Sequence, residues 1–133
     1  MIARLFITFG VAIFAAIIPF LEVNASHVFN SSWPAHAKFH EVWQLITNCG
    51  IGVVCLWLVW RKNQIQLASV LVVLVMGSIL IAHAAQGFYG GSILSGNMSK
   101  TVLGIELSAF IAGVSVVMAI AASILEYRSE RQS

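Results

Sequence analysis

The sequence predicts an all-α integral membrane protein, an antiparallel bundle of four membrane-spanning helices that forms a single domain over residues 1–133. Hydrophobic residues make up 59% of the chain and charged residues only 9%, whereas a soluble domain carries roughly 25% charged residues. A spanning helix needs about 20 predominantly apolar residues. Four apolar runs of about that length follow one another, at about 5–21, 42–60, 65–85 and 102–125.

The first run is the shortest, but its length is within the range of a spanning helix. Arg4, the apolar run, Pro19 and the triplet Val23-Asn24-Ala25 also resemble a secretory signal peptide with a small-residue cleavage site. Cleavage after Ala25 is therefore an alternative, and it would leave three spans and an external N-terminus.

The second helix is expected to begin near Pro34, because proline is accommodated in the first helical turn, and Ser32 is expected to cap it. A helix from Pro34 to Trp60 has about 27 residues and a length of about 40 Å. Because this exceeds the thickness of the hydrocarbon core, its first two turns should project outward or the helix should tilt.

His36 and His40 are four residues apart and therefore share one face of this helix. Gln44 and Thr47 continue that face, and Trp43 borders it. A polar stripe that descends into a span is not expected to face lipid. We therefore expect the stripe to face the interior of the bundle.

The short turn 61–64 predicts antiparallel contact between the second and third helices. The segment 86–100 contains four glycines and is expected to be a flexible external loop. In the fourth span, small residues recur at helical spacing and predict a helix-packing seam or a dimer face. This small-residue stripe consists of Gly104, Ser108, Ala112, Ser115, Ala119 and Ser123.

Basic residues predict the orientation, because cytoplasmic loops carry an excess of Lys and Arg. With four spans, one side holds Arg4, Arg61, Lys62, Arg128 and Arg131, and the other holds only Lys38 and Lys100. Both termini are therefore expected in the cytoplasm, in a bacterial inner membrane, and the His-rich segment 22–41 is expected outside. The net charge of +2 is too small to suggest a nucleic-acid partner.

The ionisable residues of the outer half are the candidates for chemistry, because an ionisable residue within a span is costly and indicates a functional site. His36, His40, His83 and Glu106 are the predicted catalytic set, with Glu106 about one turn inside the fourth span. We expect them to converge on one cavity. For Glu22 and Glu41 a role as polar groups at the ends of spans is preferred, and His27 is expected at the level of the lipid headgroups.

Three functions fit this set. His and Glu together can exchange protons with a hydrophobic small molecule that enters from the membrane. Alternatively, His36 and His40 have the spacing of metal ligands, and His27, or else His83 or a carboxylate, can complete a site for a divalent metal. The third alternative is a non-catalytic membrane subunit or small transporter, acting as a homodimer or with a larger partner.

Cys49 and Cys55 lie six residues apart in the second span and point to different faces, so neither a disulfide nor a redox function is expected. Asn-x-Ser triplets begin at Asn24, Asn30 and Asn97. They match the N-glycosylation pattern but carry no meaning in a bacterial protein.

The segment from His27 to His40 reads HVFNSSWPAHAKFH. It resembles the characteristic pattern HxFNxxWPxHAxFH of an uncharacterised family of short four-span membrane proteins found in bacteria and fungi. The resemblance implies the four-helix fold and the membrane location, but no activity. The layout of four spans with His and Glu near one leaflet is also similar to the emopamil-binding and sterol-isomerase superfamily, although no motif residues match.

Overall fold

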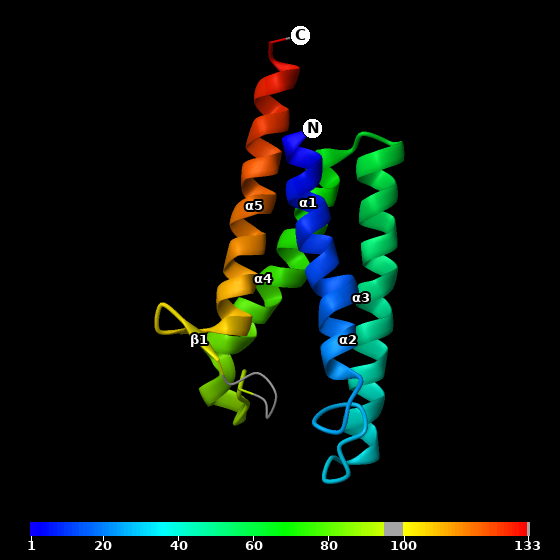
Figure 1. The fold of residues 1–133 in the computed structure, drawn as a ribbon, viewed down its shortest axis with the longest axis vertical. Helices are drawn as coiled ribbons and strands as arrows, with labels where there is room; N and C mark the ends of the chain where they lie inside the picture. The colour runs from blue at the N-terminus through cyan, green and yellow to red at the C-terminus, as the bar shows by residue number, and fades with distance from the viewer. Residues whose placement is uncertain (95–99, 133) are drawn as a thin grey trace.

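The computed structural model describes residues 1–94 and 100–132, which form four long helices and one short hairpin (Figure 1). The first helix is continuous from Ile2 to Glu22 and consists of α1 (Ile2–Ala12), the π-helical turn η1 (Ile13–Ile17) and α2 (Ile18–Glu22). It is followed by α3 (Ala35–Arg61) and α4 (Ile65–Tyr89).

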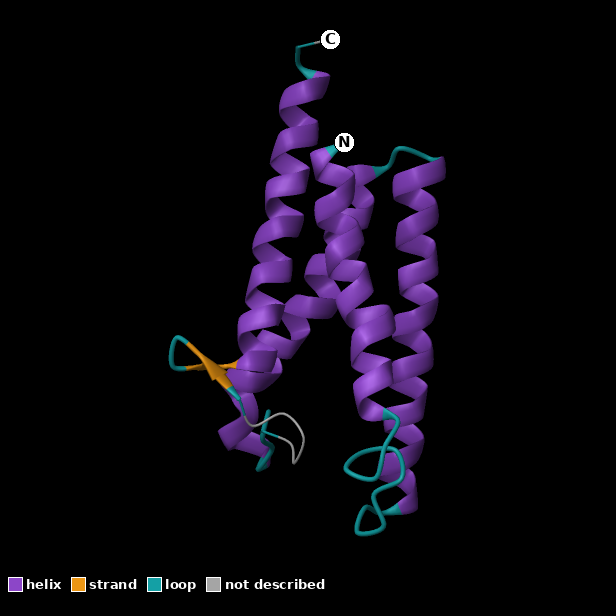
Figure 2. Ribbon diagram, viewed as in Figure 1, coloured by secondary structure: helices purple, strands orange, loops and turns teal. Residues whose placement is uncertain are grey.

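The last part of the chain begins with the two-stranded sheet β1 (Thr101–Val102) and β2 (Ile105–Glu106), which leads into α5 (Leu107–Glu130). Figure 2 shows how small this sheet is beside the helices. All four helical segments are long and apolar enough to cross a membrane. The predicted four-helix fold is therefore confirmed, and it indicates an integral membrane protein with apolar surfaces that suit contact with lipid.

The two chain termini and the α3–α4 turn lie at one end of the bundle, which we call the termini end (Figure 1). The opposite end carries residues 23–34 and the hairpin, and we call it the loop end. Consecutive helices run in opposite directions between the two ends. The 27 residues of α3 agree with the expected length, and the helix extends past α2 at the loop end.

The core is made where α1 and η1 pack against α3, α4 and α5. Its largest fully buried side chains include Phe14, Ile7, Ile65 and Met76. Residues 2–22 therefore supply a central part of the core. The predicted seam of small residues is also confirmed, because Ala112, Ser115 and Ala119 are fully buried on α5.

The helix α3 approaches η1 closely at Gly52. A Cβ atom built on Gly52 would lie 2.3 Å from the Cβ of Ala15, so the two backbones meet where only hydrogen atoms fit between them. Pro19 has no N–H to donate to the Ala15 carbonyl, as a regular helix would require. The Cys49 thiol donates to that carbonyl instead, at 3.4 Å. Both cysteines are free, as expected.

At the termini end, polar contacts join the first helix to the end of α3. The Trp60 indole donates to the Thr8 hydroxyl at 3.1 Å, and the Arg4 guanidinium lies over the Trp60 ring. Lys62 lies over the ring of Trp57 in the same way. Rings with a polar contact at one edge suit the boundary between lipid and water.

The sequence-based position of Glu106 was wrong. The fourth helix begins at Leu107, and Glu106 is the residue before it, in β2. Leu103 and Gly104 both have positive φ, at 52° and 77°, and form a tight turn that pairs Thr101 with Glu106. Gly104 therefore belongs to this turn and not to the seam of α5.

Two other helix ends differ from expectation. His83 is not in the last turn of the third helix, because α4 continues for six more residues to Tyr89. Ser32 does not cap α3, since its hydroxyl donates to the side chain of Asn30, and the helix begins directly after Pro34. The Asn97 triplet and Gly96 of the predicted flexible loop lie outside the described residues.

Candidate functional site

All four histidines lie near the loop end, and each is paired. His27 Nε2 lies 2.7 Å from Glu22 Oε2, and His83 Nε2 lies 3.5 Å from Glu106 Oε2. His36 and His40 contact each other through their Nε2 atoms at 3.0 Å. The predicted catalytic residues thus form two separate pairs. A third pair joins Glu22 to His27, neither of which belonged to the predicted catalytic set.

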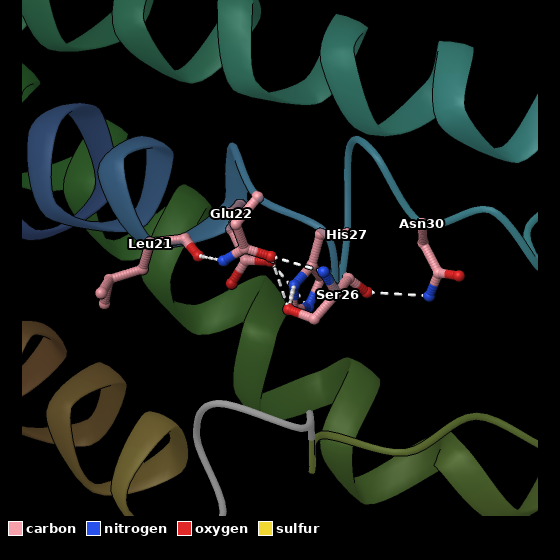
Figure 3. A network of polar contacts seen from close by, with 6 residues as sticks. Leu21, Glu22, Ser26, His27 and Asn30 are labelled. Carbon is pink, nitrogen blue, oxygen red and sulfur yellow. Dashed lines mark hydrogen bonds and ion pairs between the residues drawn. The ribbon is translucent and has the colours of Figure 1, made fainter.

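The loop that carries His27 is built by asparagine side chains (Figure 3). Asn24 donates to the carbonyl of Leu21, and its Oδ1 accepts from the backbone N–H and the hydroxyl of Ser26. Asn30 donates in turn to the carbonyl of Ser26 at 3.0 Å. These turns fold the chain back from the end of α2, so that His27 faces Glu22.

The hydrogen bonds around His27 determine where protons must lie. The Ser26 hydroxyl donates to Asn24 Oδ1 at 2.6 Å, because a carbonyl oxygen can only accept. That hydroxyl therefore accepts from the Nδ1–H of His27, which lies 2.8 Å away. The other ring nitrogen, Nε2, then faces Glu22 Oε2 at 2.7 Å. A proton on either of these two atoms makes their contact attractive, so the pair offers a place for one proton.

The pair is largely shielded from solvent. The side chains of His27 and Glu22 are 14% and 20% exposed, and the edge of the His27 ring contacts Trp33. Glu22 Oε2 is buried and has no hydrogen-bond partner, so its contact with His27 is an ion-pair contact that is not aligned for a hydrogen bond. Buried carboxylate oxygens normally accept hydrogen bonds, and exceptions are rare in native proteins. The exception at Glu22 is therefore a candidate for a functional role.

Glu22 and His27 line a cavity of about 270 Å³ between the helices at the loop end. This loop-end cavity is enclosed by residues of η1, α2, α3, α4 and α5, and most of them are apolar. The π-helical turn contributes Ile13 and Ile17, and such turns often occur at functional sites. The lining residues are Ile13, Ile17, Ile18, Leu21, Glu22, His27, Glu41, Gln44, Leu45, Met76, Ile79, Ile93, Ser108 and Ile111.

The predicted catalytic residues do not line this cavity. His83 lines a smaller hollow beside it, and His40 lines a groove along α3. Gln44 belongs to the walls of all three spaces, and the hollow of His83 also shares Ile79 and Ile93 with the cavity. The Nδ1 atom of His83 is buried without a hydrogen-bond partner.

The polar stripe of α3 does not face the bundle interior, contrary to the expectation from sequence. His36, His40, Gln44 and Thr47 are all exposed. The first turns of α3, with His36 and His40, extend past α2 at the loop end (Figure 1). Gln44 and Thr47 are exposed although residues of α2 lie beside that part of α3. Phe39 and Trp43 flank the stripe and are also exposed.

The metal site predicted from His27, His36 and His40 is not assembled as a set of three. Both ring nitrogens of His27 already have partners, in Ser26 and Glu22. Among residues 1–94 and 100–132, no group of three or more His, Cys, Asp or Glu side chains could hold a metal ion. The pair His36 and His40 is what the structure retains of that prediction.

Sequence reasoning had assigned Glu22 and Glu41 as groups at the ends of spans, and it missed that both line one cavity. A signal was present in the asparagines of the triplets at Asn24 and Asn30, which predict turns that reverse the chain.

Comparison of this chain with protein families, curated proteins and solved structures finds no match.

Proposed function

We propose that this membrane protein binds a small hydrophobic amine in the loop-end cavity and exchanges a proton with it through Glu22 and His27. The observation that carries this proposal is the Glu22 carboxylate in the wall of a mostly apolar cavity, where it is largely shielded from solvent. Its Oε2 atom contacts His27 Nε2 at 2.7 Å but accepts no aligned hydrogen bond. An ammonium group can supply the missing donor and a matching charge.

The shape and composition of the cavity support a small apolar ligand. Its volume of about 270 Å³ is close to the lower end of ligand sites in proteins, which occupy about 300–1,000 Å³. Such sites are mostly apolar, with a few polar groups that fix the orientation of the ligand. Here the polar groups are Glu22, His27, Glu41, Gln44 and Ser108, and isoleucine, leucine and methionine side chains form the remaining wall.

The charges of the lining residues support a cationic head group. Among the described residues that line the cavity are two carboxylates, Glu22 and Glu41, and one histidine, but no lysine or arginine. Opposite charges attract strongly where water is excluded, so a cationic group is favoured here and an anion is disfavoured.

Proton exchange is proposed because the contact of Glu22 with His27 offers a place for one proton. When the proton lies on His27, the Glu22 carboxylate can accept a hydrogen bond from an ammonium group. When an uncharged amine enters, the pair can transfer its proton to the amine nitrogen, and the ammonium ion then faces a carboxylate. His and carboxyl groups are the side chains that most often do this work near neutral pH.

We also propose that the chain is related to the four-span family that its segment 27–40 resembles. Three residues of its pattern, His27, Asn30 and Trp33, build the loop beside the cavity through the contacts described above. A shared pattern at these positions is expected if the family shares a ligand site.

We also propose that the termini end faces the cytoplasm of a bacterial inner membrane, because five of the seven basic residues belong to that end. In a variant without Cys49 and Cys55, cysteines introduced at the exposed positions Ser31→Cys and Gln64→Cys test this orientation in intact cells. A membrane-impermeant maleimide should label Ser31→Cys and leave Gln64→Cys unlabelled until the cells are opened. Labelling of Gln64→Cys in intact cells would contradict the proposed orientation.

The ligand proposal is tested with Glu22→Gln, which keeps the size of the side chain and removes its charge. Binding of tritiated n-octylamine to protein in lipid nanodiscs should weaken at least about tenfold, since a hydrogen bond to a charged group contributes about 1.5–3 kcal/mol. Competition by 1-octanol, which has no charge, should change less than about twofold.

The matched control is Glu126→Gln, which removes a carboxylate of α5 that does not line the cavity. This variant should bind octylamine like the parent protein. If Glu22→Gln and Glu126→Gln bind octylamine equally well, or if no variant binds more than empty nanodiscs do, the proposal is wrong.

A further inference from the structure

The pair of His36 and His40 lies outside the cavity and has no role in the proposed function. The two residues lie one turn apart at the start of α3, and both side chains are exposed. Their Nε2 atoms are 3.0 Å apart, and the ring planes are almost perpendicular, at 88°. In this hydrogen bond one nitrogen donates and the other accepts, so a single proton lies between two nitrogens of ligand type.

The distance between the nitrogens agrees with that of two histidines on one metal ion. With metal–nitrogen bonds of about 2.0–2.1 Å, two adjacent nitrogens are about 2.9 Å apart at an angle of 90° and about 3.3 Å apart at the tetrahedral angle. The observed 3.0 Å is close to the first value. Angles of 90° are typical of Cu²⁺ and Ni²⁺, for which imidazole is a suitable ligand.

We propose that His36 and His40 form a two-imidazole site for a divalent transition-metal ion, Cu²⁺ or Ni²⁺, at the exposed start of α3. The ion replaces the proton that the two Nε2 atoms share, and water fills its remaining positions. Because α3 already holds both rings at this separation, the second imidazole acts at a high effective concentration once the first has bound the ion. The site is distinct from the set of three predicted from sequence, since Glu22 and Ser26 occupy the nitrogens of His27.

Trp43 provides a local reporter for this site. Its ring centroid lies 5.7 Å from that of His40, and Cu²⁺ and Ni²⁺ quench nearby indole fluorescence. Titration of the purified protein with CuCl₂ or NiCl₂ at pH 7.5 should give saturable quenching, with equilibrium dialysis as a second measurement of bound metal. His36→Ala and His40→Ala should each weaken metal binding at least about tenfold, because only one imidazole remains.

Two controls make the outcome decisive. His83→Ala, which removes a histidine outside both the cavity and this pair, should bind the metal like the parent protein. Trp43→Phe should lose most of the quenching but keep the metal measured by dialysis. Equal metal binding by the parent, His36→Ala and His40→Ala would overturn the proposal, as would a parent protein that does not saturate.

Discussion

Replacing Gly52 with valine is expected to destabilise the bundle strongly, with a loss of at least about 2–3 kcal/mol, the upper part of the usual cost of overfilling a core. The added Cβ would meet the Cβ of Ala15 at 2.3 Å. Both atoms are fixed to helix backbones, so no side-chain rotation can relieve the clash. The helix α3 and the turn η1 would have to separate, and the thiol–carbonyl contact of Cys49 with Ala15 would be lost.

The matched control is Gly50→Val, two residues away on the same helix, where no atom lies within 4 Å of the added Cβ. The change in helix propensity is the same in both variants. Cys55 is fully buried and becomes accessible on unfolding, so a thiol-reactive dye can follow thermal unfolding. We expect Gly52→Val to unfold about 10 °C below Gly50→Val. Equal unfolding temperatures would show that α3 and η1 are not in contact at Gly52.

The helical architecture was predictable because it depends on local properties of the chain. Apolar length predicts the spans, small residues at helical spacing predict the buried face of α5, and four-residue spacing predicts the contact of His36 with His40. The start of the fourth helix was not predictable in the same way. It depends on positive φ at Leu103 and Gly104. Leucine rarely adopts positive φ, so its presence in the sequence does not predict this turn.

The direction of the polar stripe on α3 was missed for a different reason. Helical spacing predicts that His40 and Gln44 share a face, but it does not say which neighbour covers that face. Coverage depends on where α2 ends relative to α3, which is a property of the whole bundle. The same holds for the cavity, whose walls come from five elements that are distant in sequence.

The contact of Glu22 with His27 shows what an expectation based on depth alone can overlook. Sequence analysis placed both residues on the same side of the membrane, and both lie at the loop end of the bundle. Their contact, however, depends on the turns that Asn24 and Asn30 stabilise. Turn-forming asparagines next to titratable residues are therefore a useful signal in short membrane proteins.

The central claim is that the loop-end cavity is the ligand site, and filling the cavity tests it most directly. Ile79 lines the cavity from α4, whereas Ile81 on the same helix is 71% exposed and points away from the core. Ile79→Trp places a large ring in the cavity, and Ile81→Trp adds the same ring outside it. Ile17→Trp fills the cavity from the opposite wall, at a position that is 46% exposed and tolerates a larger side chain.

The decisive measurement is the binding of tritiated n-octylamine to these three variants in nanodiscs, after the dye assay has shown that Cys55 remains buried in each. We predict that Ile79→Trp and Ile17→Trp lose octylamine binding by at least about a hundredfold, which corresponds to about 2.7 kcal/mol. Ile81→Trp should bind it within about twofold of the parent protein. Folded Ile79→Trp and Ile17→Trp variants that bind octylamine as tightly as Ile81→Trp would contradict the assignment of this cavity as the ligand site.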